Sequence, residues 1–229
     1  MTAIDAINAL PAAQLRARLA GSGGDAFLRE IAEAGSSEGQ ARLGQRLIDT
    51  GQAAEGFVWL HRAAEAGHLD AINMVGRCLD LGWGVAVDKA LAAQWFRAAA
   101  ERGHGWAMYN YATALALGAG LPADRDKALD WLHRANALGI AKAANFIGSF
   151  YEDGWAVDRD MAEAARYYAR AAAGGDFRGC FNHARMLIDA GKADAAVHWI
   201  DRALTLGNDR FRAQVHDWLA ARPELRIAA

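Results

Sequence analysis

The chain has 229 residues, a length that suits one elongated domain or two small ones. Its 25 Lys and Arg against 27 Asp and Glu give a net charge of −2, without the basic excess that binding to nucleic acid or to a membrane surface requires. Two cysteines are too few for a disulfide framework. The most apolar stretch, residues 111–121, is too short to cross a bilayer, and the N-terminus lacks a secretory signal. We therefore expect a cytoplasmic globular protein.

The N-terminal segment, residues 1–37, is predicted to form a helical cap. Short helices over residues 4–10 and 11–20 precede residues 25–35, which copy the pattern of the repeats that follow. Residues 21–26 formally fit the G-x-G-x-x-A dinucleotide fingerprint, but no predicted strand precedes them. We interpret these residues as a turn between capping helices.

A sequence repeat with a regular period follows the cap. Large aromatic residues recur at one of its positions: Trp59, Trp95, Trp131, Tyr167 and, after a slightly shorter interval, Trp199. A glycine follows each aromatic residue by eight positions. This regularity predicts five repeats within residues 38–208, over residues 38–69, 70–105, 106–141, 142–177 and 178–208.

Each repeat is predicted to hold two antiparallel helices, helix A and helix B. In the second repeat helix A covers residues 70–81, a turn with Gly82 and Gly84 follows, and helix B covers residues 88–102. An aspartate that can cap the free backbone N–H groups starts helix B in three repeats: Asp88, Asp124 and Asp160. The glycine after each helix B suits a left-handed C-terminal cap. Residues 209–221 copy helix A, so residues 209–229 are predicted to form a capping helix and tail.

Small residues predict how the repeats stack. One position of helix A carries only glycine or alanine: Gly44, Gly76, Ala112, Gly148 and Ala184. With the alanine pairs of helix B, these residues let neighbouring helices approach closely while the large aromatic residues fill the space beside them. On the helix A of the second repeat, the residues expected in the core are Ala71, Ile72, Val75, Cys78 and Leu79.

The second repeat also carries a recognisable motif. Its residues are Gly82-x-Gly84-Val85, Asp88, Ala92, Trp95-Phe96, Ala99-Ala100 and Gly103-His104. This motif resembles the Sel1-like repeat, a relative of the tetratricopeptide repeat, and the likeness extends over roughly residues 38–208. The first and last repeats lack the glycine-rich turn. The resemblance implies an all-α, right-handed α-α superhelix that acts as an adaptor or scaffold for other proteins.

No motif in the sequence predicts catalysis, so we expect no catalytic residue, cofactor or metal site. His61 and His133 share one repeat position and are expected to be exposed on the convex side, whereas His68 and His104 are expected at junctions between repeats. The histidines lack the convergent spacing of a zinc site. Cys78 and Cys180 are interpreted as buried apolar residues.

A partner protein or peptide is expected to bind the concave face that the A helices line. Residues at the repeat positions opposite the core are the candidates: Asn73, Arg77, Trp106, Tyr109, Lys142, Asn145, Arg178, Phe181 and Arg185. Aromatic residues and arginine are enriched at interface hot spots. We expect a groove with aromatic anchors and a cationic end suited to acidic groups.

Several alternatives stay open at this point. An alternative interpretation of Trp106 and Tyr109 is that they pack between adjacent A helices. Trp83 and Trp155 either form a second contact patch or cover the turn glycines. The chain is read first as a non-enzymatic scaffold, second as a regulatory or substrate-docking subunit of an enzyme system. Hydrolase activity is a third reading, although the cysteine pairs of hydrolytic relatives are missing. Self-association stays open as well, and no nucleic-acid or membrane partner is expected.

Overall fold

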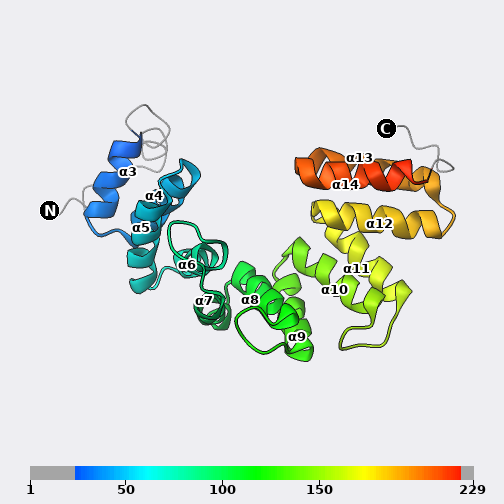
Figure 1. The fold of residues 1–229 in the computed structure, drawn as a ribbon, viewed down its shortest axis with the longest axis horizontal. Helices are drawn as coiled ribbons and strands as arrows, with labels where there is room; N and C mark the ends of the chain where they lie inside the picture. Colours follow the sequence, from blue (N-terminus) through cyan, green and yellow to red (C-terminus); the bar gives the residue numbers. More distant parts are fainter. Residues whose placement is uncertain (1–23, 223–229) are drawn as a thin grey trace. The chain divides into compact units, whose positions relative to one another are not determined.

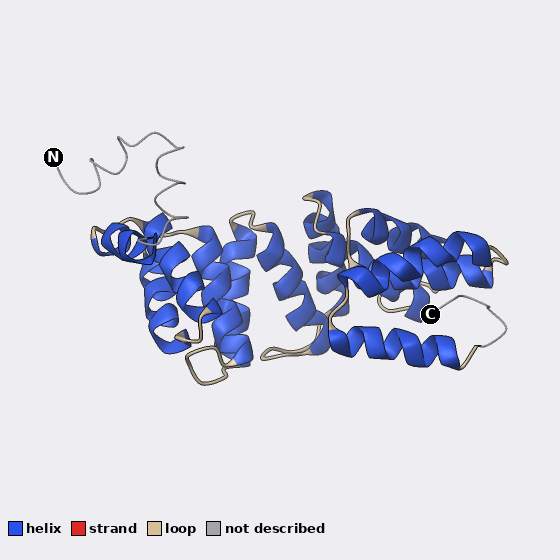
Figure 2. Ribbon diagram, turned by 90° about the horizontal axis from the view of Figure 1, so that it is seen from above, coloured by secondary structure: helices blue, strands red, loops and turns tan. Residues whose placement is uncertain are grey.

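The computed structural model describes residues 24–222, and these residues form helices without any strand (Figures 1 and 2). The two helices predicted over residues 4–20 and the tail after residue 222 lie outside the described residues. The helices are α3 (Gly24–Glu33), α4 (Ser37–Asp49), α5 (Ala53–Glu65), α6 (Leu69–Leu81), α7 (Lys89–Glu101), α8 (Gly105–Leu117), α9 (Arg125–Ala137), α10 (Ala141–Asp153), α11 (Met161–Ala173), α12 (Phe177–Asp189), α13 (Ala193–Leu206) and α14 (Asp209–Ala220).

The chain divides into two compact units, and each is described separately below. Unit 1 ends at Ala123 and unit 2 begins at Asp124. In unit 1, α4 packs on α5 and α6 on α7, while α5 also contacts α6 and α7 contacts α8. In unit 2, α10 packs on α11 and α12 on α13, and α11 contacts α12. The A helices are thus α4, α6, α8, α10, α12 and the copy α14, and the B helices are the odd-numbered ones.

Aspartate caps start three B helices, as predicted. The Asp88 carboxylate accepts a hydrogen bond from the Leu91 N–H at 2.9 Å, and the Asp124 carboxylate accepts one from the Lys127 N–H at 3.0 Å. Asp160 accepts from two N–H groups at the start of α11. These bonds satisfy backbone donors that have no partner within the helix.

Left-handed glycines end the B helices, with one exception. Gly67, Gly103, Gly139 and Gly175 have φ between +82° and +93°, as predicted. Gly207 differs, because its φ is −74° and its backbone is extended. A Cβ on Gly207 would lie 2.6 Å from the Phe211 ring. Glycine is therefore needed here to leave space for the ring, and not to allow a positive φ. The prediction of a left-handed cap is therefore wrong at Gly207.

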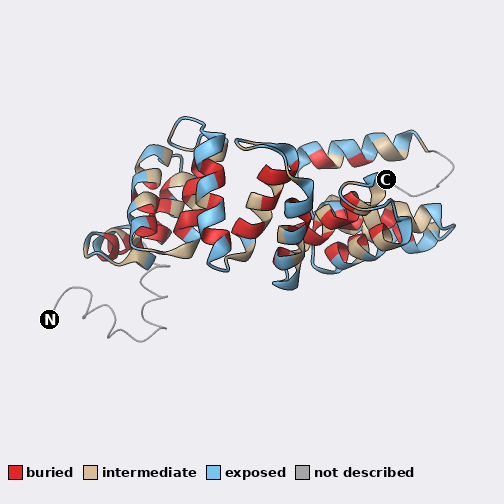
Figure 3. Ribbon diagram, turned by 90° about the horizontal axis from the view of Figure 1, so that it is seen from below, coloured by how far each residue is buried: buried red, intermediate tan, exposed pale blue. Residues whose placement is uncertain are grey.

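The core lies between the helices, where Figure 3 shows buried residues on the sides that face neighbouring helices. All five predicted core residues of α6 are buried, Ala71, Val75 and Cys78 completely. The small position of helix A receives the side chain that follows the repeat aromatic. A Cβ on Gly76 would lie 2.7 Å from the Phe96 ring, and one on Gly148 would lie 2.6 Å from the Tyr168 ring.

The repeat aromatics themselves lie at the edge of the core. Trp59 is buried, whereas Trp95, Trp131, Tyr167 and Trp199 are half-buried. The next residue in each repeat is the large side chain of helix B that enters the core, and all five are at most 4% exposed: Leu60, Phe96, Leu132, Tyr168 and Ile200. The aromatic residue therefore covers the core, and its neighbour fills it.

In the three central repeats, the turn between helices A and B has positive φ at two positions. Gly82 and Gly84 have φ of +75° and +72°, and the corresponding residues of the next repeat have φ of +68° and +80°. In the repeat after that, Ala156 occupies the second position at φ +57° and is the one non-glycine residue with positive φ among residues 24–222. A side chain is strained there because its Cβ crowds the backbone.

Replacing Ala156 with glycine is expected to stabilise unit 2 by about 0.5–1 kcal/mol, since the relief of left-handed strain exceeds the added entropy of the unfolded chain. Urea denaturation followed by circular dichroism measures the change. Ala86→Gly, in the equivalent turn of unit 1 but without positive φ, is the matched control and should destabilise by about 0.5–1 kcal/mol. A loss of stability with Ala156→Gly would contradict the interpretation.

Candidate functional site: the helix-A faces

Trp106 is the most open of the predicted partner-binding aromatics. It lies in the first turn of α8 in unit 1, and 46% of its surface is exposed. Tyr109 lies one turn later, and the two rings meet edge to face at a centroid distance of 6.2 Å. Trp106 thus presents a large apolar surface whose orientation is supported by a neighbouring ring.

Asn73 does not lie on an open face. It is 6% exposed, because Asn110 of the next A helix packs over it and donates a hydrogen bond from Nδ2 to Asn73 Oδ1 at 2.9 Å. The expectation that Asn73 is available to a partner is therefore wrong. Its amide instead links α6 to α8.

Arg77 turns toward the end of its helix. Its guanidinium lies over the Trp83 ring, 4.7 Å from the centroid, and Nη1 also contacts the Met74 sulfur. In unit 2 the guanidinium of Arg125 lies 4.0 Å from the centroid of Trp155, and the Trp155 ring meets Phe150 edge to face. Trp83 and Trp155 are both half-buried. Each turn tryptophan therefore packs against its own unit, with an arginine over its ring.

Two histidines join consecutive A helices of unit 1. Nδ1 of His68 accepts from the Ala71 N–H, and its Nε2 lies 2.8 Å from Glu38 Oε2 on the preceding A helix. His104 repeats the arrangement, with Nδ1 accepting from the Ala107 N–H and Nε2 lying 2.7 Å from Asp70 Oδ1. Because Nδ1 accepts a hydrogen bond in each case, the ring proton is on Nε2, and the Nε2–H group donates a hydrogen bond to the carboxylate.

This double role goes beyond the junction position expected from the sequence. Each histidine caps the A helix that it starts and binds the first turn of the A helix before it. The sequence carries one signal for this arrangement, an acidic residue two positions after the N-cap of the preceding A helix. Glu38 and Asp70 hold that position, each in the A helix that precedes its histidine.

In unit 2, Arg185 and Glu152 form the centre of a polar network. Nη2 of Arg185 on α12 lies 3.0 Å from Glu152 Oε2 on α10, and the two side chains are only 26% and 22% exposed. The Tyr168 hydroxyl donates to the same carboxylate at 2.5 Å. Asn182 donates to Asn145 at 2.9 Å and accepts from Arg185. The predicted site residues Asn145 and Arg185 are therefore held by partners within the chain.

The network shifts the titration of its acidic groups. Burial acts to raise the pKa of Glu152, but the hydrogen bonds from Arg185 and Tyr168 outweigh it and lower the pKa below its usual value. Burial and the hydrogen bond to Glu152 raise the pKa of Tyr168. The carboxylate of Glu152 compensates the charge of Arg185, so this arginine is a weaker attractor for acidic groups than the sequence suggests.

The remaining predicted residues of unit 2 differ in exposure. Arg178 is exposed and lies over the Phe177 ring at 5.2 Å, and Lys142 is half-buried. Phe181 meets the Trp218 ring of the capping helix α14 edge to face at 5.2 Å and also contacts Phe211. The aromatic surface of Phe181 therefore belongs largely to the packing of α14.

The outer faces of the B helices carry rings rather than free histidines. His61 meets the Trp95 ring of the next repeat at 5.6 Å, and His133 meets Tyr167 at 5.9 Å. His133 is half-buried rather than exposed as expected, whereas the side chain of His61 keeps 40% of its surface exposed. Burial lowers the pKa of His133. Their rings serve the contact between repeats.

The cysteines and the other possible metal ligands of the described residues were the remaining candidates for a chemical site. Cys78 and Cys180 are free and fully buried, as predicted, and burial raises the pKa of the Cys78 thiol to about 11. Within residues 24–222, no three His, Cys, Asp or Glu residues lie together as metal ligands would. In the same part of the chain, every helix is too short or too polar to serve as a membrane span.

The paired helices, left-handed turns and stacked cores define an α-helical repeat protein of the solenoid class. The model of the Sel1 repeat matches residues 37–68, 69–104, 107–140 and 141–176, and the chain belongs to this family. Sel1 repeat proteins generally serve as scaffolds for protein–protein interaction. The resemblance seen in the sequence is thereby confirmed.

Solved structures agree with this assignment. A Sel1 repeat protein from Oxalobacter formigenes is 25% identical with a TM-score of 0.80, over 98% of this chain and 92% of that one. The protective antigen c5321 of uropathogenic Escherichia coli, described as displaying an SLR fold, is 26% identical with a TM-score of 0.70, over 84% of this chain and 43% of its own. A putative sel1 repeat protein from Klebsiella pneumoniae shares the fold at 19% identity and a TM-score of 0.60, over 84% of this chain and 98% of that one. No curated protein matches the sequence.

Proposed function

We propose that this protein is a non-enzymatic scaffold that binds a partner protein or peptide on its helix-A faces. The exposed ring of Trp106 is the observation that carries the proposal. Among the described residues, it is the one aromatic side chain that is both large and exposed. Tryptophan at such a position contributes strongly to interfaces because it buries a large area at a small entropy cost.

The helix-A face of unit 2 supports the proposal in a different way. Arg185 and Asn145 are already fixed by Glu152 and Asn182. A partner that bonds to this network finds ordered groups, which reduces the entropy that binding costs. Arg178 is exposed and is the cation of this face best placed for acidic groups.

We also propose that five repeats lie between two caps, over residues 38–208. The Sel1 model matches four stretches ending at residue 176. Support for a fifth repeat comes from α12 and α13, which pack as a pair around Cys180, Ala184 and Ile200. In this proposal α3 and α14 close the two ends, since a terminal repeat needs a polar outer side.

Trp106→Ala is expected to abolish capture of the native partner from a lysate of the host, because truncation removes the central apolar contact. Affinity capture with mass spectrometry measures it. The control is Val58→Ala, which removes an exposed apolar side chain of similar exposure from helix B of the same unit. Equal retention of the partner by both variants would contradict the proposal, and so would equal loss. The circular-dichroism melt of each variant shows whether it is folded.

A further inference from the structure

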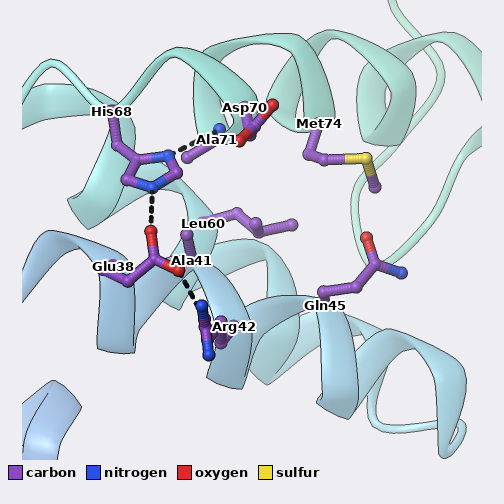
Figure 4. Close-up of a pocket in the computed structure, with 9 residues that line it drawn as sticks. All are labelled: Glu38, Ala41, Arg42, Gln45, Leu60, His68, Asp70, Ala71 and Met74. Atoms are coloured by element: carbon purple, nitrogen blue, oxygen red, sulfur yellow. Dashed lines mark hydrogen bonds and ion pairs between the residues drawn. The ribbon is translucent and has the colours of Figure 1, made fainter. Parts of the chain in front are cut away.

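Unit 1 contains a pocket on its helix-A side, between α4 and α6 (Figure 4). Its volume is about 190 Å³, which suits one side chain rather than a whole ligand. The interior is apolar, with Leu60 behind it and Ala41 and Met74 beside it. Glu38, Arg42 and Asp70 supply charged groups at its margin.

The charges at the margin do not cancel. Glu38 is matched by its ion pair with Arg42 and also binds His68. His68 and His104 each accept a backbone hydrogen bond at Nδ1, so both rings are neutral. Asp70 binds neutral His104 through Oδ1, which leaves a formal charge of −1 among the residues that line the pocket. The guanidinium of Arg77, which contacts the Met74 sulfur from outside the lining, lies over the Trp83 ring. The Asp70 side chain is 76% exposed and is open to an incoming cation.

We propose that this pocket binds a lysine or arginine side chain of the partner. The aliphatic stem lies against Leu60 and Met74, and the cationic group pairs with the Asp70 carboxylate. Long basic side chains combine an apolar stem with a charged end, which is the combination that this pocket offers. An aliphatic side chain would leave Asp70 unused, and an acidic one would be repelled by it. The proposal rests on the proposed partner-binding function and adds the chemistry of one contact.

Spacing relates this pocket to Trp106 within unit 1. Side-chain hydrogen bonds join α4 to α6 and α6 to α8, and helices in contact lie about 10 Å apart, so the pocket between α4 and α6 is one to two helix spacings from α8. An extended peptide advances about 3.3 Å per residue. A partner segment that uses both features would therefore carry its basic residue and its apolar residue about four or five positions apart.

Methyl NMR of the full chain labelled at methionine tests the pocket directly. The probes are the acetyl, methylamide-capped forms of arginine, leucine and glutamate. Met74 lines the pocket, whereas Met108, Met161 and Met186 do not and serve as internal references. We expect the arginine probe to shift the Met74 methyl signal saturably and the glutamate probe to leave it unchanged. The leucine probe should bind more weakly than the arginine probe.

The variant Asp70→Asn separates charge from shape. It keeps an oxygen that can accept from His104, and it should weaken binding of the arginine probe about two- to fivefold, the effect of losing one exposed ion pair. Asp126→Asn makes the same change in an exposed residue of unit 2 and should leave binding unchanged. Unaltered reference methyl signals show that each variant is folded.

Three results would overturn the proposal: no shift of Met74 with arginine, equal binding of leucine, or an unchanged dissociation constant with Asp70→Asn. None of these affects the role of Trp106, which the capture experiment tests separately. Loss of capture with Trp106→Ala together with any of these results would leave the scaffold function supported and this pocket assignment refuted.

Discussion

Gly84→Ala is expected to destabilise unit 1 by about 3 kcal/mol, because two effects add at this position. Gly84 has φ of +72°, which costs a residue with a side chain about 1–2 kcal/mol. A Cβ would also overlap the carbonyl group of Ala53 at the start of α5, and overpacking of this kind costs about 1–3 kcal/mol. A helix backbone cannot move aside as a flexible side chain can, so the turn itself must lift away.

Gly103→Ala is the matched control for this substitution. Gly103 has φ of +93°, but nothing lies within 4 Å of the position of a Cβ. Its replacement should therefore cost only the backbone strain, about 1 kcal/mol. Urea denaturation followed by circular dichroism gives both free energies of unfolding. Equal losses for the two variants would show that contact with α5 does not determine the choice of glycine at position 84.

Arg185→Leu is expected to destabilise unit 2 by about 2 kcal/mol, because it breaks a largely buried ion pair. The variant leaves the Glu152 carboxylate with the Tyr168 hydroxyl but without its cation. Removing one partner of a fully buried pair costs about 3–5 kcal/mol, and the partial exposure of this pair reduces that figure. Arg166→Leu is the control, because its pair with Glu163 is exposed and should contribute less than about 0.5 kcal/mol.

The loss caused by Arg185→Leu should depend on pH. Because the pKa of Glu152 is lowered in the folded protein, the stabilisation is complete above the pKa of the unfolded chain, about 4.3. It disappears as the pH falls through the lower pKa of the folded state, where Glu152 becomes protonated. The difference between wild type and variant should therefore be constant near neutral pH and shrink as the solution is made strongly acidic. A difference that grows on acidification would contradict this assignment.

The helix pairs could be predicted from the sequence because their causes are local. The period of the aromatic residues, the aspartates at helix starts and the glycines at helix ends each act within a few residues. Asp88 and Gly103 therefore behave as predicted. Gly207 does not, because the ring of Phe211, a residue of the next helix, determines its environment. That effect depends on packing rather than on a local rule.

The candidate site could be predicted only in part. The residues near it in the sequence determine which face of a helix a side chain occupies, but tertiary packing determines which partner that side chain contacts. Placing Trp106 on an open face required only helical spacing. Asn73 and Arg185 were assigned to the same face, yet Asn110 covers the first and Glu152 binds the second. In both units the two paired asparagines are 37 positions apart in the sequence, and this repeated spacing could have indicated that they bind each other.

The two asparagine pairs have a consequence for how such a chain can grow. Asn73–Asn110 and Asn145–Asn182 are displaced by two repeats, and so are the glycine–ring contacts Gly76–Phe96 and Gly148–Tyr168. A gene that gained or lost one of the central repeats would set an asparagine against phenylalanine, methionine or tyrosine and leave its amide without a partner, at a cost of about 1–3 kcal/mol where that amide is buried. Duplication in doublets avoids this mismatch. Lengthened versions of the protein should therefore be built by inserting repeats in pairs.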